Sequence, residues 1–175
     1  MKPLGRLASS CALAGWILSF APGGACAEEG AHPLRSHMPP GPGLTALQKA
    51  VAGARRRLER PACQALFSEF RDLSGRRLQE NLDALGQTPA TYLGLVLFAD
   101  ASRHAHCKAG GVFAFTSPNS RVVYVCGAEL SEAAGRNLGV VEAVLIHEEL
   151  HSLGLGENPP TSEEITARVL STCPS

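Results

Sequence analysis

Two histidines lie one helical turn apart near the C-terminal end of the chain, in the motif His147-Glu148-Glu149-Leu150-His151. Side chains four positions apart lie on the same face of an α-helix, so the two imidazoles can converge on one metal ion. The H-E-x-x-H spacing is typical of zinc sites in which the first glutamate is a general base. The sequence therefore predicts that His147 and His151 bind Zn²⁺ and that Glu148 takes a proton from water.

A catalytic zinc site needs a third protein ligand and keeps one position open. The residues after His151 contain no further histidine or aspartate, so the candidates are Glu157, Glu163 and Glu164. Glu157 extends the motif to H-E-x-x-H-x-x-G-x-x-E. Glu164 stands on the next predicted helix, where Thr161-x-x-Glu164 also fits a capping box. The residues alone leave all three glutamates open.

The segment 147–169, HEELHSLGLGENPPTSEEITARV, resembles the active-site region of compact gluzincin-type zincin metallopeptidases. It is similar, more narrowly, to short exported bacterial proteins with an HExxH-x-LGLGENPP segment. The resemblance implies a minimal zincin-like α+β core, one zinc ion and a peptide or protein substrate. It also implies that the third ligand comes from the next helix, which favours Glu164, and that an edge strand at 114–116 or 122–125 pairs with the substrate.

The elements that must position these residues follow from hydrophobic periodicity. Helices are predicted over 44–60, 62–72, 76–85, 137–153 and 161–172, and the fourth is apolar on nearly every side, as a buried helix is. Strands are predicted over 91–98, 112–116 and 121–126. Turn residues at 117–120 join the last two strands into a hairpin. The expected fold is α+β, with a small antiparallel sheet and a short helix after the active-site helix.

Two groups of residues around the hairpin have an ordinary structural interpretation. His104 and His106 precede Cys107 and are expected to lie in a loop. Tyr124 lies on the predicted second strand of the hairpin, where packing is the expected role and oxyanion stabilisation is the alternative.

The N-terminal residues have the pattern of a secretory signal peptide. Lys2 and Arg6 precede an apolar run over 7–20, and Ala25-Cys26-Ala27 has the form of a cleavage site. The sequence therefore predicts a signal peptide over 1–27 and a secreted or periplasmic protein. A Pro/Gly-rich arm over 28–43 is expected to be disordered, and a single domain follows over 44–175.

Four cysteines remain after such cleavage, and none are in C-x-x-C spacing. In an oxidising compartment they predict two disulfides rather than a thiolate zinc site. Cys107 and Cys126 bracket the predicted hairpin and are expected to pair. That leaves Cys63 and Cys173, which would tie an early helix to the C-terminus.

The overall charge excludes some functions. Sixteen Lys and Arg balance sixteen Asp and Glu, so the composition gives no case for nucleic-acid binding. The apolar run over 7–20 is shorter than the ~20 residues that a spanning helix needs, so a cleaved signal peptide is expected rather than a membrane anchor, and no membrane span is expected after cleavage. The sequence predicts an exported zinc metallopeptidase. The alternative is a disulfide-stapled secreted binding or structural module with a structural or vestigial zinc site.

Overall fold

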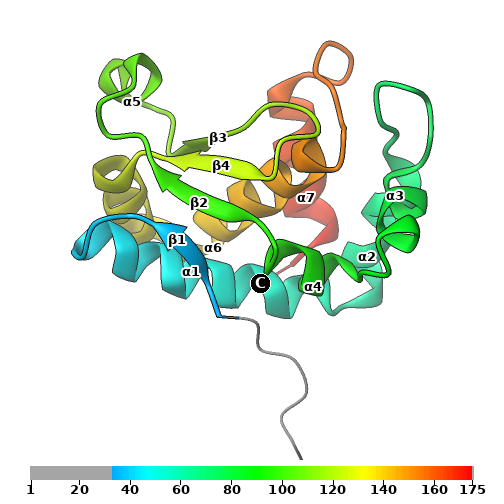
Figure 1. Cartoon of the computed structure of the whole chain (residues 1–175), viewed down its shortest axis with the longest axis horizontal. Coiled ribbons are helices and arrows are strands. Elements are labelled where there is room, and N and C mark those ends of the chain that lie inside the picture. Colours follow the sequence, from blue (N-terminus) through cyan, green and yellow to red (C-terminus); the bar gives the residue numbers. More distant parts are fainter. Residues whose placement is uncertain (1–32, 175) are drawn as a thin grey trace, which may run out of the picture.

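The computed structural model describes residues 33–174, which form a mixed α+β fold, as the sequence predicts (Figure 1). The helices in this range are α1 (Pro42–Leu58), α2 (Pro61–Glu69), α3 (Leu78–Ala84), α4 (Pro89–Leu93), α5 (Ala105–Ala109), α6 (Gly127–Ser152) and α7 (Ser162–Thr172). The strands are β1 (Arg35–His37), β2 (Leu97–Asp100), β3 (Ala114–Phe115) and β4 (Val122–Val125). The predicted signal peptide, 1–27, lies outside the described residues.

The four described strands form one mixed sheet in the order β1-β2-β4-β3. β3 and β4 pair in antiparallel fashion, which confirms the predicted hairpin. β1 and β4, however, both pair with β2 in parallel, so the rest of the sheet is not antiparallel as expected. Long connections that contain helices join β1 to β2 and β2 to β4, and such crossovers are what parallel pairing requires.

Part of the segment expected to be a disordered arm is ordered. Arg35–His37 forms β1 at the edge of the sheet, Met38 is buried in the core, and α1 begins at Pro42. The prediction over 28–43 rested on the high content of proline and glycine. An edge strand needs only backbone hydrogen bonds and one apolar anchor, and proline suits the first turn of a helix, so this composition does not prevent order here.

The predicted strand over 91–98 is divided between a helix and a strand. Thr88 and Thr91 form a capping box, in which the Thr88 hydroxyl accepts a hydrogen bond from the Thr91 N–H at 3.2 Å. Pro89 occupies the first helical turn. These residues begin a helix, α4, where the sequence predicts the start of a strand, so β2 begins only at Leu97.

The longest described helix, α6, packs along α1 and also contacts β3, β4 and α7 (Figure 1). Asn137 interrupts α6 with φ −157° and ψ 96°, at the position where the sequence predicts a helix start. Gly53 of α1 lies so close to Glu142 that a Cβ atom would collide with the carboxylate. Arg57 forms a buried ion pair with Glu142 at 2.8 Å, which fixes the two helices together.

Two disulfides join the pairs that the sequence predicts, Cys63 with Cys173 and Cys107 with Cys126. The first connects α2 to the residue after α7 across a separation of 110 residues, a loop length worth about 3–5 kcal/mol by chain entropy. The second connects α5 to the residue between β4 and α6. Within residues 33–174, no helix has the length and apolar character that a membrane crossing requires.

Candidate metal centre

The second half of α6 carries the H-E-x-x-H motif into the protein interior. Ile146 and Leu150 lie in the hydrophobic core. His147, Glu148 and His151 are also buried, with exposed fractions of 4%, 6% and 5%. Burying polar groups is costly unless they have partners. The contacts of these three side chains therefore indicate whether they could hold a metal ion.

The two imidazoles and a carboxylate converge. The Nε2 atoms of His147 and His151 lie 2.8 Å apart. Oε1 of Glu157 lies 3.2 Å from Nε2 of His151 and 3.8 Å from Nε2 of His147. One ligand atom from each residue lies within 4.8 Å of the other two. Two imidazole nitrogens and one glutamate oxygen are a donor set that catalytic zinc sites use.

Each imidazole is oriented by a partner on its other nitrogen. Nδ1 of His151 donates a hydrogen bond to the carbonyl oxygen of Leu155 at 2.7 Å. Nδ1 of His147 lies 2.9 Å from Oγ1 of Thr166 on α7. Since a carbonyl oxygen only accepts, neutral His151 carries its proton on Nδ1 and presents the lone pair of Nε2. Metal-binding histidines are typically held in this way.

The turn after α6 brings Glu157 back to the imidazoles. α6 ends at Ser152, and Gly154 has φ +110°, a conformation that favours glycine. A Cβ atom at Gly154 would lie 2.8 Å from Oδ1 of Asn119 and 2.9 Å from Cβ of Asp72. Both the backbone conformation and the close approach therefore require glycine in this turn.

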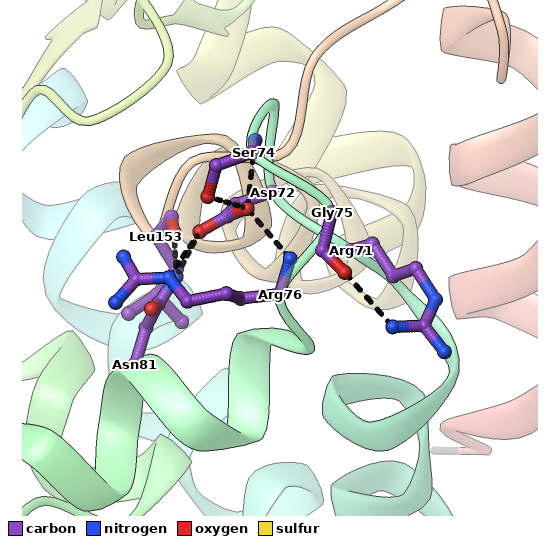
Figure 2. A network of polar contacts seen from close by, with 7 residues as sticks. All are labelled: Arg71, Asp72, Ser74, Gly75, Arg76, Asn81 and Leu153. Carbon is purple, nitrogen blue, oxygen red and sulfur yellow. Dashed lines mark hydrogen bonds and ion pairs between the residues drawn. The ribbon is translucent and has the colours of Figure 1, made fainter.

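The buried carboxylate of Asp72 connects a neighbouring turn to the end of α6 (Figure 2). Oδ1 of Asp72 accepts hydrogen bonds from the Ser74 N–H at 2.8 Å, the Ser74 hydroxyl at 2.6 Å and the Arg76 N–H at 2.9 Å. Oδ2 accepts from Nδ2 of Asn81 at 3.0 Å, and the same Nδ2 donates to the Leu153 carbonyl at 2.9 Å. These donors, Asn81 foremost, hold the pKa of Asp72 well below its usual range.

Glu148 lines the same cleft as the three donors. Burial raises the pKa of Glu148 to about 8, helped by the negative charge of Glu157 and opposed by a hydrogen bond from the Thr116 backbone. Burial, together with the neighbouring His151, lowers the pKa of His147 to about 4. His147 is therefore neutral at pH 7, and neutral imidazole is the form that binds metal ions.

Glu149 differs from its neighbours in the motif. It is fully buried, and neither of its carboxylate oxygens has a hydrogen-bond partner among the described residues. Burial raises the pKa of Glu149 well above its usual range, which favours the neutral acid.

The cleft beside the donors has a volume of about 750 Å³. Its lining includes β3 and the residues that follow it, together with His147, Glu148 and His151 of α6. α5 and the loop that precedes α7 stand at opposite ends of β3 (Figure 1). The volume lies in the range of small-molecule pockets, about 300–1,000 Å³.

The structure does not bring Glu164 or Glu163 to the imidazoles. Oε2 of Glu164 accepts a hydrogen bond from the Thr161 N–H at 2.8 Å, and the Thr161 hydroxyl accepts from the Glu164 N–H at 3.2 Å. This capping box holds Glu164 at the exposed start of α7, and Glu163 is exposed beside it. Glu157 instead lies with His147 and His151.

Sequence reasoning missed two cleft residues, His104 and His106. Both were expected in a loop, but His104 caps α5 and His106 lies on it, and both line the cleft. A usable signal was present in the sequence. The pair directly precedes Cys107, and the predicted bond to Cys126 connects this segment to the end of the hairpin.

Comparisons with protein-family models, with curated proteins and with solved structures gave no match for this chain. The zincin resemblance therefore stays a prediction.

Proposed function

We propose that this protein is an exported zinc-dependent metallopeptidase. The observation that carries the proposal is the convergence of His147, His151 and Glu157 beside Glu148 at one cleft. The two disulfides support export, because such bonds persist in oxidising compartments.

The donor count favours a catalytic site over a structural one. Structural zinc sites are closed by four protein ligands, whereas catalytic sites use three and keep a position open. Among residues 33–174, three donors form the group and the cleft opens beside them. A disulfide-stapled module with a structural or vestigial zinc remains the alternative, and the experiment below separates the two.

In the proposed mechanism His147, His151 and Glu157 hold the ion. A bound Zn²⁺ supplies Lewis acidity, which polarises a carbonyl group and makes water nucleophilic near neutral pH. The positive charge of a bound ion would lower the raised pKa of Glu148, so that its carboxylate could accept a proton from water in the cleft and return it to the leaving amine. Leu155 and Thr166 keep the two imidazoles oriented throughout.

The sheet offers a place for the substrate backbone. β3 is the outermost strand beside the cleft, and it pairs with β4 on one side. An extended peptide can add to such an edge through backbone hydrogen bonds. Thr116, which follows β3 directly, donates to Glu148, so a peptide on this edge would pass close to the base.

The test combines metal analysis with a chelator-reversible cleavage assay on a mixed peptide library. The wild-type chain is expected to hold one zinc ion and to cleave. Glu148→Gln is expected to keep the zinc and lose cleavage by about 10²-fold or more. Exposed Glu163→Gln is the matched control and is expected to behave like the wild type. Bound zinc without cleavage by the wild type favours the module, and full turnover by Glu148→Gln contradicts the mechanism.

A further inference from the structure

Four aromatic rings gather in the cleft, and together we call them the aromatic shelf: His104, His106, Phe115 and Tyr124. The ring centre of Phe115 lies 4.9 Å from that of His104, 5.0 Å from that of His106 and 5.4 Å from that of Tyr124. The Phe115 and Tyr124 rings are stacked, with 21° between their planes. All four residues line the cleft that contains the metal donors.

The aromatic shelf is largely exposed. Tyr124 is 42% exposed, both histidines are exposed, and Phe115 is half-buried. Phe115 packs not on the main core but on a separate small cluster that contains Cys107 and Cys126. Exposed aromatic rings inside a cleft are typical of surfaces that bind a ligand.

The fold holds the aromatic shelf in place before any ligand arrives. Phe115 and Tyr124 are direct partners across the β3–β4 pair. The Cys107–Cys126 disulfide fastens α5, which carries the histidine pair, to the end of β4. A rigid surface loses little conformational entropy on binding, so its contacts contribute more of their energy to affinity.

The aromatic shelf lies next to the proposed chemistry. Phe115 directly precedes Thr116, whose backbone hydrogen-bonds Glu148. One residue along a strand advances the chain by about 3.3 Å. A side chain that stacks on Phe115 therefore belongs to a substrate residue close to the bond that Glu148 would help to break.

We propose that the aromatic shelf is a substrate subsite for an aromatic side chain flanking the scissile bond. This inference rests on the proposed peptidase function. The cleft lining also includes the apolar residues Val112, Ala114 and Pro118, beside polar Thr116, Ser117 and Ser162. No lysine or arginine is among the described residues that line the cleft, so an acidic side chain would lack a permanent cation there. Ring stacking supplies the attraction instead.

The test uses the zinc-loaded full chain and blocked peptides that differ at one position, with Phe, Ala or Asp. kcat and KM are measured for the wild type, and direct binding of the same peptides is measured on zinc-loaded Glu148→Gln. The wild type is expected to prefer the Phe peptide. His106→Ala and Tyr124→Ala are each expected to reduce the Phe-to-Ala preference by about 2- to 10-fold, mainly through KM.

His37→Ala is the matched control, because His37 is an exposed histidine on β1 that does not line the cleft. It is expected to keep the full Phe preference. Equal kcat/KM values for the Phe, Ala and Asp peptides would overturn the proposed subsite but not the proposed peptidase function. An unchanged preference in both shelf variants overturns it as well. Selective binding of the Phe peptide without any cleavage supports the subsite and overturns the proposed hydrolysis.

Discussion

Replacing Asp72 by alanine tests how strongly the turn at Asp72 controls the candidate metal centre. The substitution removes the acceptor of five hydrogen bonds with lengths of 2.6, 2.8, 2.9, 3.0 and 3.3 Å. A hydrogen bond to a charged group contributes about 1.5–3 kcal/mol, and contributions within one network are not additive. We therefore expect the free energy of unfolding to fall by about 3–5 kcal/mol.

The same substitution is expected to weaken zinc binding. Asn81 bridges Asp72 and the Leu153 carbonyl, and the Leu73 N–H donates to the Gly154 carbonyl at 3.0 Å. The next carbonyl along this turn orients His151. Loss of such an outer partner typically lowers metal affinity about 10- to 100-fold, so Asp72→Ala is expected to fall in this range.

Denaturant unfolding followed by circular dichroism measures the first effect, and chelator competition for zinc measures the second. Asp83→Ala is the matched control, because Asp83 is exposed and, among the contacts described, its carboxylate accepts a hydrogen bond only from the side chain of Gln79, at 2.7 Å. That pair is worth about 0.2–0.5 kcal/mol. If the free energy of unfolding falls no more in Asp72→Ala than in Asp83→Ala, the hydrogen bonds of Asp72 do not stabilise the fold as proposed. Normal zinc affinity in a destabilised Asp72→Ala refutes the coupling to the site.

The pH dependence of this contribution has a defined sign. The folded-state pKa of Asp72 lies well below the value of about 3.9 expected in the unfolded chain. The stabilisation is therefore fully present above about pH 4 and is lost as the pH falls through the folded-state pKa. The difference in unfolding free energy between the wild type and Asp72→Ala is expected to shrink on acidification below about pH 4. A difference that grows in acid contradicts the assignment.

Three further substitutions test other parts of the structure. Glu157→Gln removes a proposed metal ligand and is expected to weaken zinc retention about tenfold or more in chelator competition. Glu164→Gln alters only a helix cap, so it is expected to cost about 1 kcal/mol of stability and to keep the zinc. The opposite ranking of the two variants in zinc retention would make Glu164 the third ligand. Gly154→Ala forces a Cβ atom into an occupied turn at φ +110° and is expected to cost about 2 kcal/mol or more in denaturant unfolding, so a wild-type unfolding midpoint would disprove the close approach. Arg57→Met leaves Glu142 buried without its cation and is expected to cost about 3–5 kcal/mol in the same assay; a cost below about 1 kcal/mol would show that other contacts hold α1 to α6.

The parts of the fold that local patterns encode could be predicted from the sequence. The buried helix with His147 and His151, the β3–β4 hairpin and the start signal at Asn137 all depend on residues close together in the chain. The disulfide pairs could be predicted too, because four cysteines allow few pairings and one pair brackets the hairpin.

The third donor and the parallel sheet depend on contacts between distant segments. Glu157 and Glu164 have the same chemistry, and only the turn at Gly154, shaped by Asp72, decides which carboxylate returns to the imidazoles. β1 pairs with a strand some sixty positions away through backbone groups, which every residue type provides. Residue patterns report side-chain periodicity and carry little information about such pairings.

The bond between Cys63 and Cys173 spans most of the domain, and this has a practical consequence for following the chain under proteolysis. A single cut by a protease anywhere between these positions leaves two pieces that are still joined as one molecule. Such nicking escapes detection on a gel run without reductant. Samples should therefore be compared on gels run with and without reductant to establish whether a preparation is intact.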